Sequence, residues 1–364
     1  MLFFCYRYTH TSRMFWGKSL LVLSAVVLVC SAADFLDEEW KIWKTKYGKL
    51  YKNEKVEAFR RQVWEETWRR VHKHNELANQ SLKKYTLKAN QFADMTLQER
   101  TQNQKCPKSN VPKEAAIQRR RFETTGAIPE EVDWRNSGCV TPVKNEGEIC
   151  DASWAFSAVG VIETRYCLKH NELISFSEQQ LLDCNSENDG CCGGSAVNVF
   201  EYVEYLGLMR SKDYEYAETA FACLYNPEDV VNINITKYYV LSGEENIAKV
   251  LAMDGPVAAV IQFSEDFRFY NGGIYGERDE DCSPSGSRSV TVIGYGSECG
   301  TDYWILKNSW GNEWGEKGYA RVNLQARNCI KSKNLGAKQK LSRQISPEDQ
   351  KCISLLWTIS KGWR

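Results

Sequence analysis

The chain has 364 residues, of which 43% are hydrophobic and 12% aromatic. This length allows two packed domains and a removable segment. Lys and Arg together number 47, as do Asp and Glu, so the formal net charge is zero. No global charge therefore attracts nucleic acid or an acidic membrane surface, and neither is expected as a partner.

Residues 1–33 have the pattern of a targeting signal. A basic start that includes Lys18 leads into the apolar run Leu20–Val29, which is followed by small residues. This run is shorter than a membrane-spanning helix, which needs about 20 residues, so we expect a secretory signal peptide cleaved near Ala32 or Ala33 and no membrane span. A buried core helix is the alternative interpretation. Secretory entry predicts an extracellular or lysosomal protein, whose 14 cysteines form disulfides rather than metal sites.

A polar, aromatic-rich segment from Asp34 to about Lys105 has helical periodicity. The residues at helical spacing are Trp40, Trp43, Tyr47, Tyr51, Phe59, Val63, Val71 and Leu77. By itself this pattern predicts only an amphipathic helical segment that packs against another part of the protein. The periodicity stops in residues 106–126, which contain the basic run Arg119–Arg121. Proteolysis concentrates in such exposed linkers, so we expect processing there, by another protease if the chain is inactive.

The remaining part of the chain has a helical half followed by a strand-rich half. Ser153–Lys169 has spaced apolar residues and no proline, which predicts a helix, and Ser177–Asp183 predicts a second helix. Ala258–Ile261 and Val290–Ile293 are short apolar runs near glycine-rich turns, as is typical of strands. The pattern predicts an α+β protein in which helices and strands are segregated along the chain.

Three stretches of the sequence carry a specific resemblance. Residues 143–157 read Val-Lys-Asn-Glu-Gly-Glu-Ile-Cys-Asp-Ala-Ser-Trp-Ala-Phe-Ser, residues 303–311 read Tyr-Trp-Ile-Leu-Lys-Asn-Ser-Trp-Gly, and residues 128–135 read Ile-Pro-Glu-Glu-Val-Asp-Trp-Arg. They resemble the papain-like cysteine protease family, of the cathepsin L type. The positions that match the two prosegment motifs of this family are Arg60, Trp64, Val71, Asn75, Asn90, Phe92 and Asp94. Val56, Thr67 and Lys88 depart from those motifs.

The resemblance implies a papain-like two-domain α+β fold, with a helical left domain and a β-barrel-like right domain on either side of a cleft. It assigns residues 34–126 to an inhibitor-type propeptide with its basic linker, and residues 127–330 to the peptidase domain. In such proteins the propeptide folds onto the peptidase domain and blocks the cleft, so the chain's own propeptide is an expected partner. Residues 331–364 form a divergent basic tail, interpreted as a solvated extension or an error in the gene sequence, and no role is assigned to it; a functional tail is the alternative.

The residues at the family's catalytic positions have changed. Ser153 stands where the family has its nucleophilic cysteine, Arg288 where it has the histidine, and Glu146 where a glutamine donates to the oxyanion. Asn308, which orients the histidine in the family, is retained. A serine needs a general base, arginine stays protonated, and an ionised glutamate only accepts hydrogen bonds. The histidines of the chain are His10, His72, His74 and His170, and none falls at the expected position.

Three functions are compatible with these changes. The first is a pseudopeptidase whose cleft, marked by Gly193, Gly194 and Trp310, binds peptides or proteins without cutting them, or whose prosegment restrains active relatives. The second is an active endopeptidase or esterase that uses Ser153, with Asp151 as an unusual base rather than a solvated loop carboxylate. The third is a structural protein linked by disulfides. The loss of three separate catalytic roles favours the first.

Opposite charges at two of these positions suggest a direct contact. If the resemblance holds, Glu146 and Arg288 lie on opposite walls of the cleft and can form a charge-assisted pair that closes the former site. The alternative is that both side chains point into solvent. One extra residue between Gly147 and Cys150, relative to the family, can also displace the turn that carries the nucleophile.

The resemblance implies three disulfides, Cys150–Cys191, Cys184–Cys223 and Cys282–Cys329. The cysteines after residue 126 that are left unassigned are Cys139, Cys167, Cys192, Cys299 and Cys352. They can be buried thiols, a free reactive thiol or intermolecular bridges. The spacings do not match a zinc site, and no metal or cofactor is expected. Asn79 and Asn234 lie in acceptor triplets for N-glycosylation.

Overall fold

The chain divides into two units, Met1–Glu66 and Thr67–Arg364. The computed structural model describes residues 35–102, 127–235, 238–241, 243–276, 286–324 and 354–359. The expected signal peptide, the basic linker and the cysteines Cys282, Cys329 and Cys352 lie outside the described residues. Among the helices that are described, none is long and apolar enough to cross a membrane.

Two helical segments form the described part of the first unit, residues 35–46 and the first half of α2 (Glu54–Asn79). The ring of Trp40 stacks on that of Trp43, with centroids 5.3 Å apart. Trp64 of α2 packs against Trp40 at 5.4 Å. The predicted helical spacing is therefore confirmed for Trp40, Trp43 and Trp64, which pack together in the interior of this unit, whereas Phe59 is exposed.

The second unit begins with the remainder of α2, followed by β1 (Tyr85–Leu87) and α3 (Leu97–Gln102). The amide of Asn75 connects α2 to β1, because its Nδ2 donates to the Leu87 carbonyl oxygen and its Oδ1 accepts from the Leu87 N–H, both at 2.8 Å. The two hydrogen bonds satisfy both polar atoms of the side chain. Asn75 thereby fixes β1 against the helix.

Three helices form a layer in the second unit, α4 (Ser153–His170), α5 (Glu178–Cys184) and α6 (Ala196–Leu206). Ser177 caps α5 and Ser195 caps α6, each accepting a hydrogen bond from a backbone N–H in the first turn. All residues of α4 from its start to Cys167 are buried. A helix that is buried on every side must be apolar around most of its circumference, which explains why its apolar residues do not form a single stripe.

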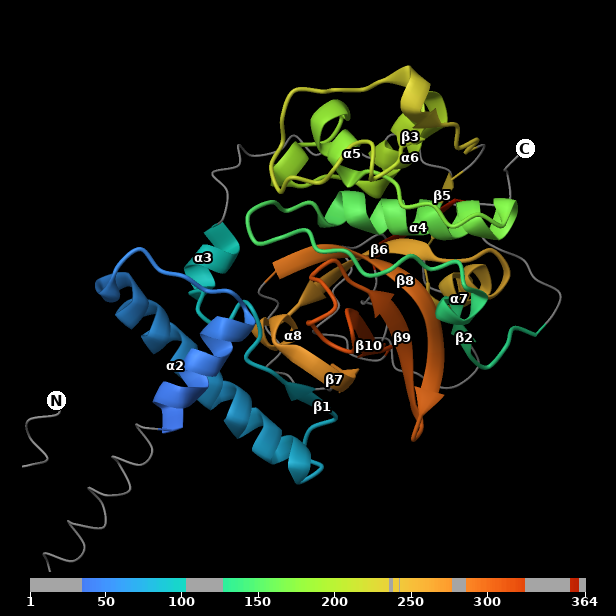
Figure 1. The fold of residues 1–364 in the computed structure, drawn as a ribbon. Helices are drawn as coiled ribbons and strands as arrows, with labels where there is room; N and C mark the ends of the chain where they lie inside the picture. The colour runs from blue at the N-terminus through green and yellow to red at the C-terminus, as the bar shows by residue number, and fades with distance from the viewer. Residues whose placement is uncertain are drawn as a thin grey trace, which may run out of the picture. The chain divides into compact units, whose positions relative to one another are not determined.

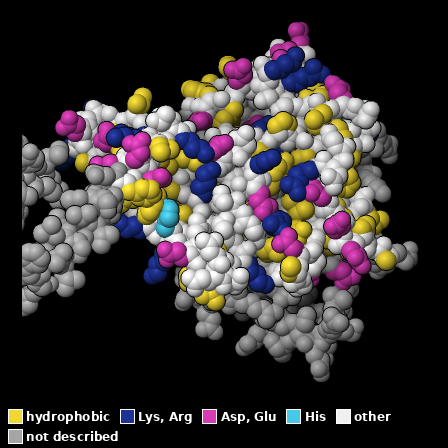
Figure 2. All heavy atoms as spheres, turned by 60° about the horizontal axis from the view of Figure 1, so that its bottom comes forward, with side chains coloured by type: hydrophobic (Ala, Val, Ile, Leu, Met, Phe, Trp, Pro, Cys, Tyr) yellow, Lys and Arg dark blue, Asp and Glu magenta, His cyan; other side chains and the backbone are white. Residues whose placement is uncertain are grey.

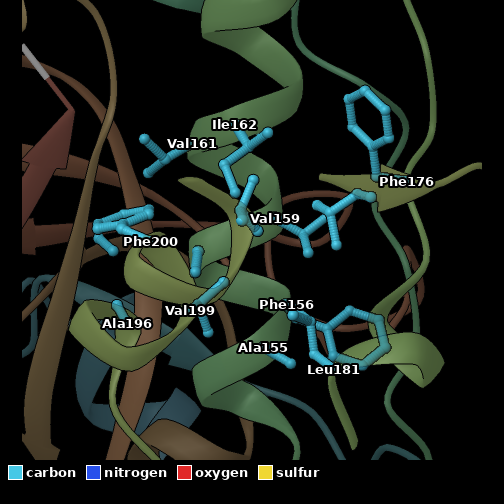
Figure 3. Close-up of a cluster of buried hydrophobic side chains, with 14 of the residues drawn as sticks. Ala155, Phe156, Val159, Val161, Ile162, Phe176, Leu181, Ala196, Val199 and Phe200 are labelled. Atoms are coloured by element: carbon cyan, nitrogen blue, oxygen red, sulfur yellow. The ribbon is translucent and has the colours of Figure 1, made fainter. Parts of the chain in front are cut away.

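The core of this layer is apolar and lies between the helices. Figure 3 shows Val159 and Ile162 of α4 among side chains from the neighbouring elements, including Phe176, Leu181 and Phe200. The opposite face of α4 packs against the two strands β6 (Val257–Phe263) and β8 (Gly286–Glu298). Because α4 is packed on both faces, its first residue is held in a rigid frame.

A mixed sheet forms the other layer. Its strands, besides β1, are β2 (Val132–Asp133), β5 (Tyr238–Leu241), β6 (Val257–Phe263), β7 (Tyr270–Tyr275), β8 (Gly286–Glu298), β9 (Thr301–Lys307), β10 (Tyr319–Asn323) and β11 (Ser354–Ile359). The order is β1-β7-β10-β9-β8-β6-β11-β5, with β2 on β8 (Figure 1). The strands predicted at residues 258–261 and 290–293 are confirmed within β6 and β8.

Smaller elements complete the second unit. They are α7 (Glu244–Met253), α8 (Glu265–Arg268), the short strands β3 (Leu208–Met209) and β4 (Val230–Val231), and the 3-10 turns Trp134–Ser137, Gly190–Cys192 and Pro227–Asp229. β3 and β4 pair with each other in a separate two-stranded sheet. The helical layer and the mixed sheet together agree with the predicted α+β class.

The strand β11 corrects the interpretation of the C-terminal tail. Its six residues pair antiparallel with β5 on one side and with β6 on the other. An apolar run that lies between two strand edges provides hydrogen-bond partners for backbone groups that those edges would otherwise leave unpaired. The solvated extension expected for the tail is therefore wrong for residues 354–359, which are part of the sheet.

Disulfides of the second unit confirm two of the expected pairs, Cys150–Cys191 and Cys184–Cys223. A third bridge, Cys139–Cys167, joins two cysteines that the sequence left unassigned. Its Cα atoms are 5.4 Å apart although 28 residues separate them in the chain, and only the tertiary structure shows this proximity. Cys192 is also disulfide-bonded, and Cys299 is a free, exposed thiol.

Charges of both signs lie on the protein surface. On the face shown in Figure 2, Lys and Arg side chains are interspersed with Asp and Glu side chains. Exposed ion pairs of the second unit include Lys249–Glu245 and Arg321–Glu298, each with an N–O distance of 2.6 Å. Such pairs contribute about 0–1 kcal/mol each to stability, because water screens them.

Candidate active site

The second unit brings together the four residues predicted at the catalytic positions. Ser153 is the first residue of α4, Glu146 lies in the loop before it, Arg288 is in β8, and Asn308 follows β9. The Oγ of Ser153 accepts a hydrogen bond from the backbone N–H of Ser289 at 3.2 Å. The start of α4 is thus adjacent to the strand that carries Arg288.

Glu146 and Arg288 form the expected ion pair. The Nη2 of Arg288 lies 2.8 Å from Oε1 of Glu146, and each side chain is only 5% exposed. Ser309 bridges the two, because its Oγ accepts from Arg288 and donates to Glu146, both at 2.9 Å. The indole of Trp310 donates to Glu146 at 3.1 Å, and its ring lies 3.9 Å below the guanidinium carbon of Arg288. The alternative with both side chains in solvent is wrong.

The electrostatics at Glu146 follow from its burial. Loss of water raises the pKa of this carboxyl above its ordinary value, while the charge and hydrogen bond of Arg288 act in the opposite direction. The negative charge of Asp151 raises the pKa further. Both oxygens of Glu146 accept hydrogen bonds from Arg288, Ser309 and Trp310. This position therefore offers no donor to an oxyanion.

The hydroxyl of Ser153 has a carboxylate neighbour. Its Oγ donates to Oδ1 of Asp151 at 3.3 Å, although Asp151 itself is exposed. The interpretation of Asp151 as only a solvated loop carboxylate is therefore incomplete. A carboxylate is a weak base for a serine hydroxyl, whose activation in hydrolases usually requires an imidazole or an amine.

The described histidines have other roles. His72 and His74 are in α2, where the ring of His72 bonds to a backbone oxygen one turn earlier and buried His74 bonds to the Tyr85 carbonyl oxygen. His170 is at the end of α4, the opposite end from Ser153, and stacks on Tyr166. In the part of the chain that the structure describes, no imidazole contacts Ser153.

The side-chain amide of Asn308 is buried and unpaired within the described residues. Its side chain is about 4% exposed, and neither Nδ2 nor Oδ1 makes a hydrogen bond within the described residues. A buried amide with no partner lowers stability, because its hydrogen bonds to water have been lost without replacement. In the family that the sequence resembles, this amide orients a histidine. In this chain Arg288 stands at that position, and its Nη2 donates to Glu146 and Ser309 instead of to Asn308.

Replacing Asn308 with leucine is expected to leave the free energy of unfolding unchanged or to raise it by up to about 1 kcal/mol, since the change removes two unsatisfied polar atoms at similar volume. Urea denaturation of the two proteins measures the difference. Asn185 is a matched control, because it is equally buried and its amide makes hydrogen bonds to the Asn198 carbonyl oxygen and from the Glu187 N–H. Asn185→Leu is expected to cost about 1–3 kcal/mol. A similar cost for Asn308→Leu would contradict the assignment.

A small cavity borders this site, and Asn308, Ser309 and Ser289 are among the residues that line it. The same cavity meets a buried charge cluster that the sequence did not indicate, formed by Lys144, Glu163, Glu178 and Lys307. Lys144 Nζ lies 2.6 Å from Glu163 and 2.7 Å from Glu178. Burial lowers the pKa of Lys307 to about 8, and its Nζ donates to Thr141 at 2.8 Å. Glu163 lies in α4, Glu178 in α5 and Lys307 in β9, and Lys144 lies in the loop before α4. The charge cluster therefore joins the helical layer to the sheet.

The residues predicted to mark a cleft are placed as follows. Gly193 and Gly194 follow a 3-10 turn, and Trp310 contacts the Glu146–Arg288 pair. A Cβ at Gly194 would lie 2.6 Å from the ring of Trp154, so only glycine permits this approach of the loop to α4. A role of Gly193 and Gly194 in holding a peptide remains a prediction.

The prosegment part of the second unit also contacts Trp310. β1 pairs antiparallel with β7, and Asn90 Nδ2 donates to the Arg268 carbonyl oxygen at 2.8 Å. The side chain of Gln91 donates to the Trp310 carbonyl oxygen at 3.0 Å. The Phe92 ring packs edge-on against the Trp310 ring, with centroids 5.3 Å apart. The chain's own propeptide is therefore a partner of the peptidase domain, as expected.

Two further predictions concern modification and metal binding. Asn79, at the end of α2, and Asn234 are both exposed, and their glycosylation remains a prediction. The described residues contain no cluster of three or more His, Cys, Asp or Glu that could hold a metal ion.

Comparisons with known proteins agree with this arrangement. The profile of the papain family cysteine proteases matches residues 128–338, and that of the cathepsin propeptide inhibitor domain matches residues 40–99. A cathepsin L-like proteinase of Fasciola hepatica is 38% identical over 299 residues, covering 79% of this chain and 88% of that protein. Procathepsin L of Felis catus is 39% identical over 319 residues, covering 83% of this chain and 93% of its own length. The structure of digestive procathepsin L2 proteinase from Tenebrio molitor larval midgut matches with a TM-score of 0.73 and 32% identity, over 89% of this chain and 99% of that chain.

Proposed function

Because the chain belongs to the papain family of cysteine proteases and resembles its cathepsin L-like members, we propose that it is a pseudopeptidase that binds peptide or protein segments in its cleft without cutting them. The buried Glu146–Arg288 pair is the observation that carries this proposal. Arg288 stands at the position of the general base, and a guanidinium that is always protonated cannot accept a proton. Glu146 stands at the oxyanion position, and an ionised carboxylate cannot donate a hydrogen bond.

The remaining residues support the same function. Ser153 retains a hydroxyl at the start of α4. The positive end of a helix dipole can ionise a thiol, but the pKa of an alcohol is too high for the dipole alone to ionise it. Asn308 retains an amide with nothing to orient. The base, the nucleophile and the oxyanion donor are lost together. General acid–base catalysis accelerates a reaction by a factor of about 10²–10⁴, and one oxyanion donor raises kcat by a factor of about 10²–10³, so both rate enhancements are removed.

One contact favours a second candidate function. The hydrogen bond from Ser153 to Asp151 is the geometry that a serine-based hydrolase or esterase would need if a carboxylate served as its base. The candidate is weaker than the first, because Glu146 leaves the developing oxyanion without its side-chain donor.

We also place the protein in the secretory pathway, in an extracellular or lysosomal compartment. The disulfides of the described residues support this location, since such bonds persist in oxidising compartments. An inactive chain cannot process itself, so removal of the propeptide falls to another protease. The basic run Arg119–Arg121 is the proposed place for that cleavage.

A hydrolysis assay distinguishes the two candidate functions. The full chain is cleaved with an added protease, the protease is inactivated, and turnover of a fluorogenic dipeptide library is compared between the wild type and Ser153→Ala. Equal turnover at the level of the buffer blank is the expected result. Turnover by the wild type that disappears in Ser153→Ala would establish a serine hydrolase and overturn the proposed function.

A further inference from the structure

Arg268 is a partly buried cation that forms no ion pair with a carboxylate of the described residues. It ends α8, and its guanidinium carbon lies 5.4 Å from the ring centroid of Phe92, 5.8 Å from that of Phe263 and 5.3 Å from that of Trp310. Its Nε makes no hydrogen bond, and within the described residues no carboxylate forms an ion pair with it. Burial and the neighbouring charge of Arg288 lower the pKa of Arg268 to about 10. Removing a guanidinium from water without an anion is costly, and contacts with aromatic faces offset only part of that cost.

The carboxylates near Arg268 have other partners. Glu146 is bonded to Arg288, Ser309 and Trp310. Asp266, two residues away on α8, pairs with Arg70 and accepts from the Tyr85 hydroxyl. Asp151 accepts from Ser153, and it acts on Arg268 only through longer-range charge, as Glu146 does.

The prosegment covers Arg268 with an apolar ring. Phe92 stacks over the guanidinium, while its neighbour Gln91 has a buried Oε1 that makes no hydrogen bond with Arg268 or with any other described residue. The propeptide therefore covers the cation without satisfying it. Once this segment leaves, the guanidinium and the face of Trp310 become available to a ligand in the cleft.

We propose that Arg268 is a specificity-determining residue of the cleft, which selects peptide segments that place an Asp or Glu side chain where Phe92 lies in the proform. The planar fork of a guanidinium matches a carboxylate with two parallel hydrogen bonds, and the surrounding rings hold it in one orientation. An acidic side chain at this place satisfies the free Nε and supplies the missing negative charge. The inference rests on the proposed function, because it requires a cleft that accepts a peptide.

The test uses a peptide whose position the structure defines. β1 pairs with β7 in a register that places Tyr85 opposite Gly273. A synthetic peptide of residues 83–97 that binds in the same register has its residue 92 next to Arg268, where Phe92 lies in the proform. The fluorescein-labelled, C-terminally amidated peptide is prepared with its own sequence, with Phe92→Glu and with Phe92→Gln. Fluorescence anisotropy then measures the dissociation constants for the full chain after its propeptide has been cleaved and removed.

The peptide with Phe92→Glu is expected to bind about tenfold more tightly than the one with Phe92→Gln, and this ratio is expected to fall to about one in Arg268→Leu. Raising the salt concentration to 0.5 M is expected to reduce the ratio for the wild-type protein, a measurement that does not depend on how Arg268→Leu folds. Equal binding of the two peptides overturns the inference and leaves the proposed function standing. A ratio that persists in Arg268→Leu also overturns it. If none of the peptides binds, the proposed function fails and the inference fails with it.

A further pair of peptides separates two sources of the carboxylate. Residues 83–91 are prepared with a free C-terminus and with an amide, which places a terminal carboxylate next to the position of Phe92. The pair is expected to bind equally. Tighter binding of the free acid that disappears in Arg268→Leu would overturn the assignment to an acidic side chain in favour of a C-terminal carboxylate.

Discussion

Changing Glu146→Gln, Ser153→Cys and Arg288→His together is expected to create a peptidase that hydrolyses a fluorogenic dipeptide substrate at least about 10³-fold faster than the wild type. No side chain caps α4 at Ala152, and the positive end of the helix dipole favours a thiolate at position 153. An imidazole at position 288 supplies the base, and the unpaired amide of Asn308 regains a group to orient. A glutamine at position 146 restores the oxyanion donor.

Activity is measured after removal of the propeptide with an added, then inactivated, protease. The matched control carries Glu146→Gln, Ser153→Ala and Arg288→His, and it is expected to remain inactive. Adding Asn308→Ala to the active triple variant should lower kcat, whereas in the wild-type background the same change leaves the blank rate as it is. A folded triple variant without activity would show that the extra residue between Gly147 and Cys150 has displaced the nucleophile, and that more than the side chains was lost.

Replacing Glu146 alone with leucine is expected to lower the free energy of unfolding by about 3–5 kcal/mol. The change leaves Arg288 charged and 5% exposed, with no anion to pair with, and it removes the acceptor of the Ser309 and Trp310 donors. The double variant Glu146→Leu, Arg288→Met is expected to recover most of this loss, because replacing a whole buried pair with apolar side chains is often neutral or stabilising.

Urea denaturation of the two single variants and the double variant completes a double-mutant cycle, for which we expect a coupling energy of more than about 2 kcal/mol. The exposed pair Lys249–Glu245 provides the control, since Glu245→Leu is expected to cost less than about 1 kcal/mol. A cost for Glu146→Leu no larger than for Glu245→Leu would mean that water reaches the pair, and that it does not close the former site.

The candidate site was largely predictable because its residues lie in continuous motifs. Ser153, Glu146 and Asn308 each fall within a stretch that resembles the family over many consecutive residues. Arg288 was located by its distance from Val292–Tyr295, which follow it on the same strand. Motif position indicates which residues share a site, but it does not give the direction of a side chain. The sequence therefore left open whether Glu146 and Arg288 would pair or point into solvent.

Features that depend on contacts across the fold were missed or misread. The Cys139–Cys167 bridge and the charge cluster around Lys144 have no signature in residue spacing. Nothing in the sequence around Arg268 distinguishes it from an ordinary surface arginine. It becomes unusual only because Phe92, Phe263 and Trp310 converge on it from three separate segments.

The class of fold, the helices that begin at Ser153 and Ser177, the central strands, the family, and the residue types at its catalytic positions could be predicted from the sequence. These depend on local periodicity and on the identity of residues within short motifs, which folding does not alter. Three features required the tertiary structure: the pairing of Glu146 with Arg288, the lack of a side-chain hydrogen bond at Asn308 within the described residues, and the place of residues 354–359 between β5 and β6. Each of these depends on which distant segments are buried against one another, and the energy of a charge or an amide is set by that burial rather than by its neighbours in the chain.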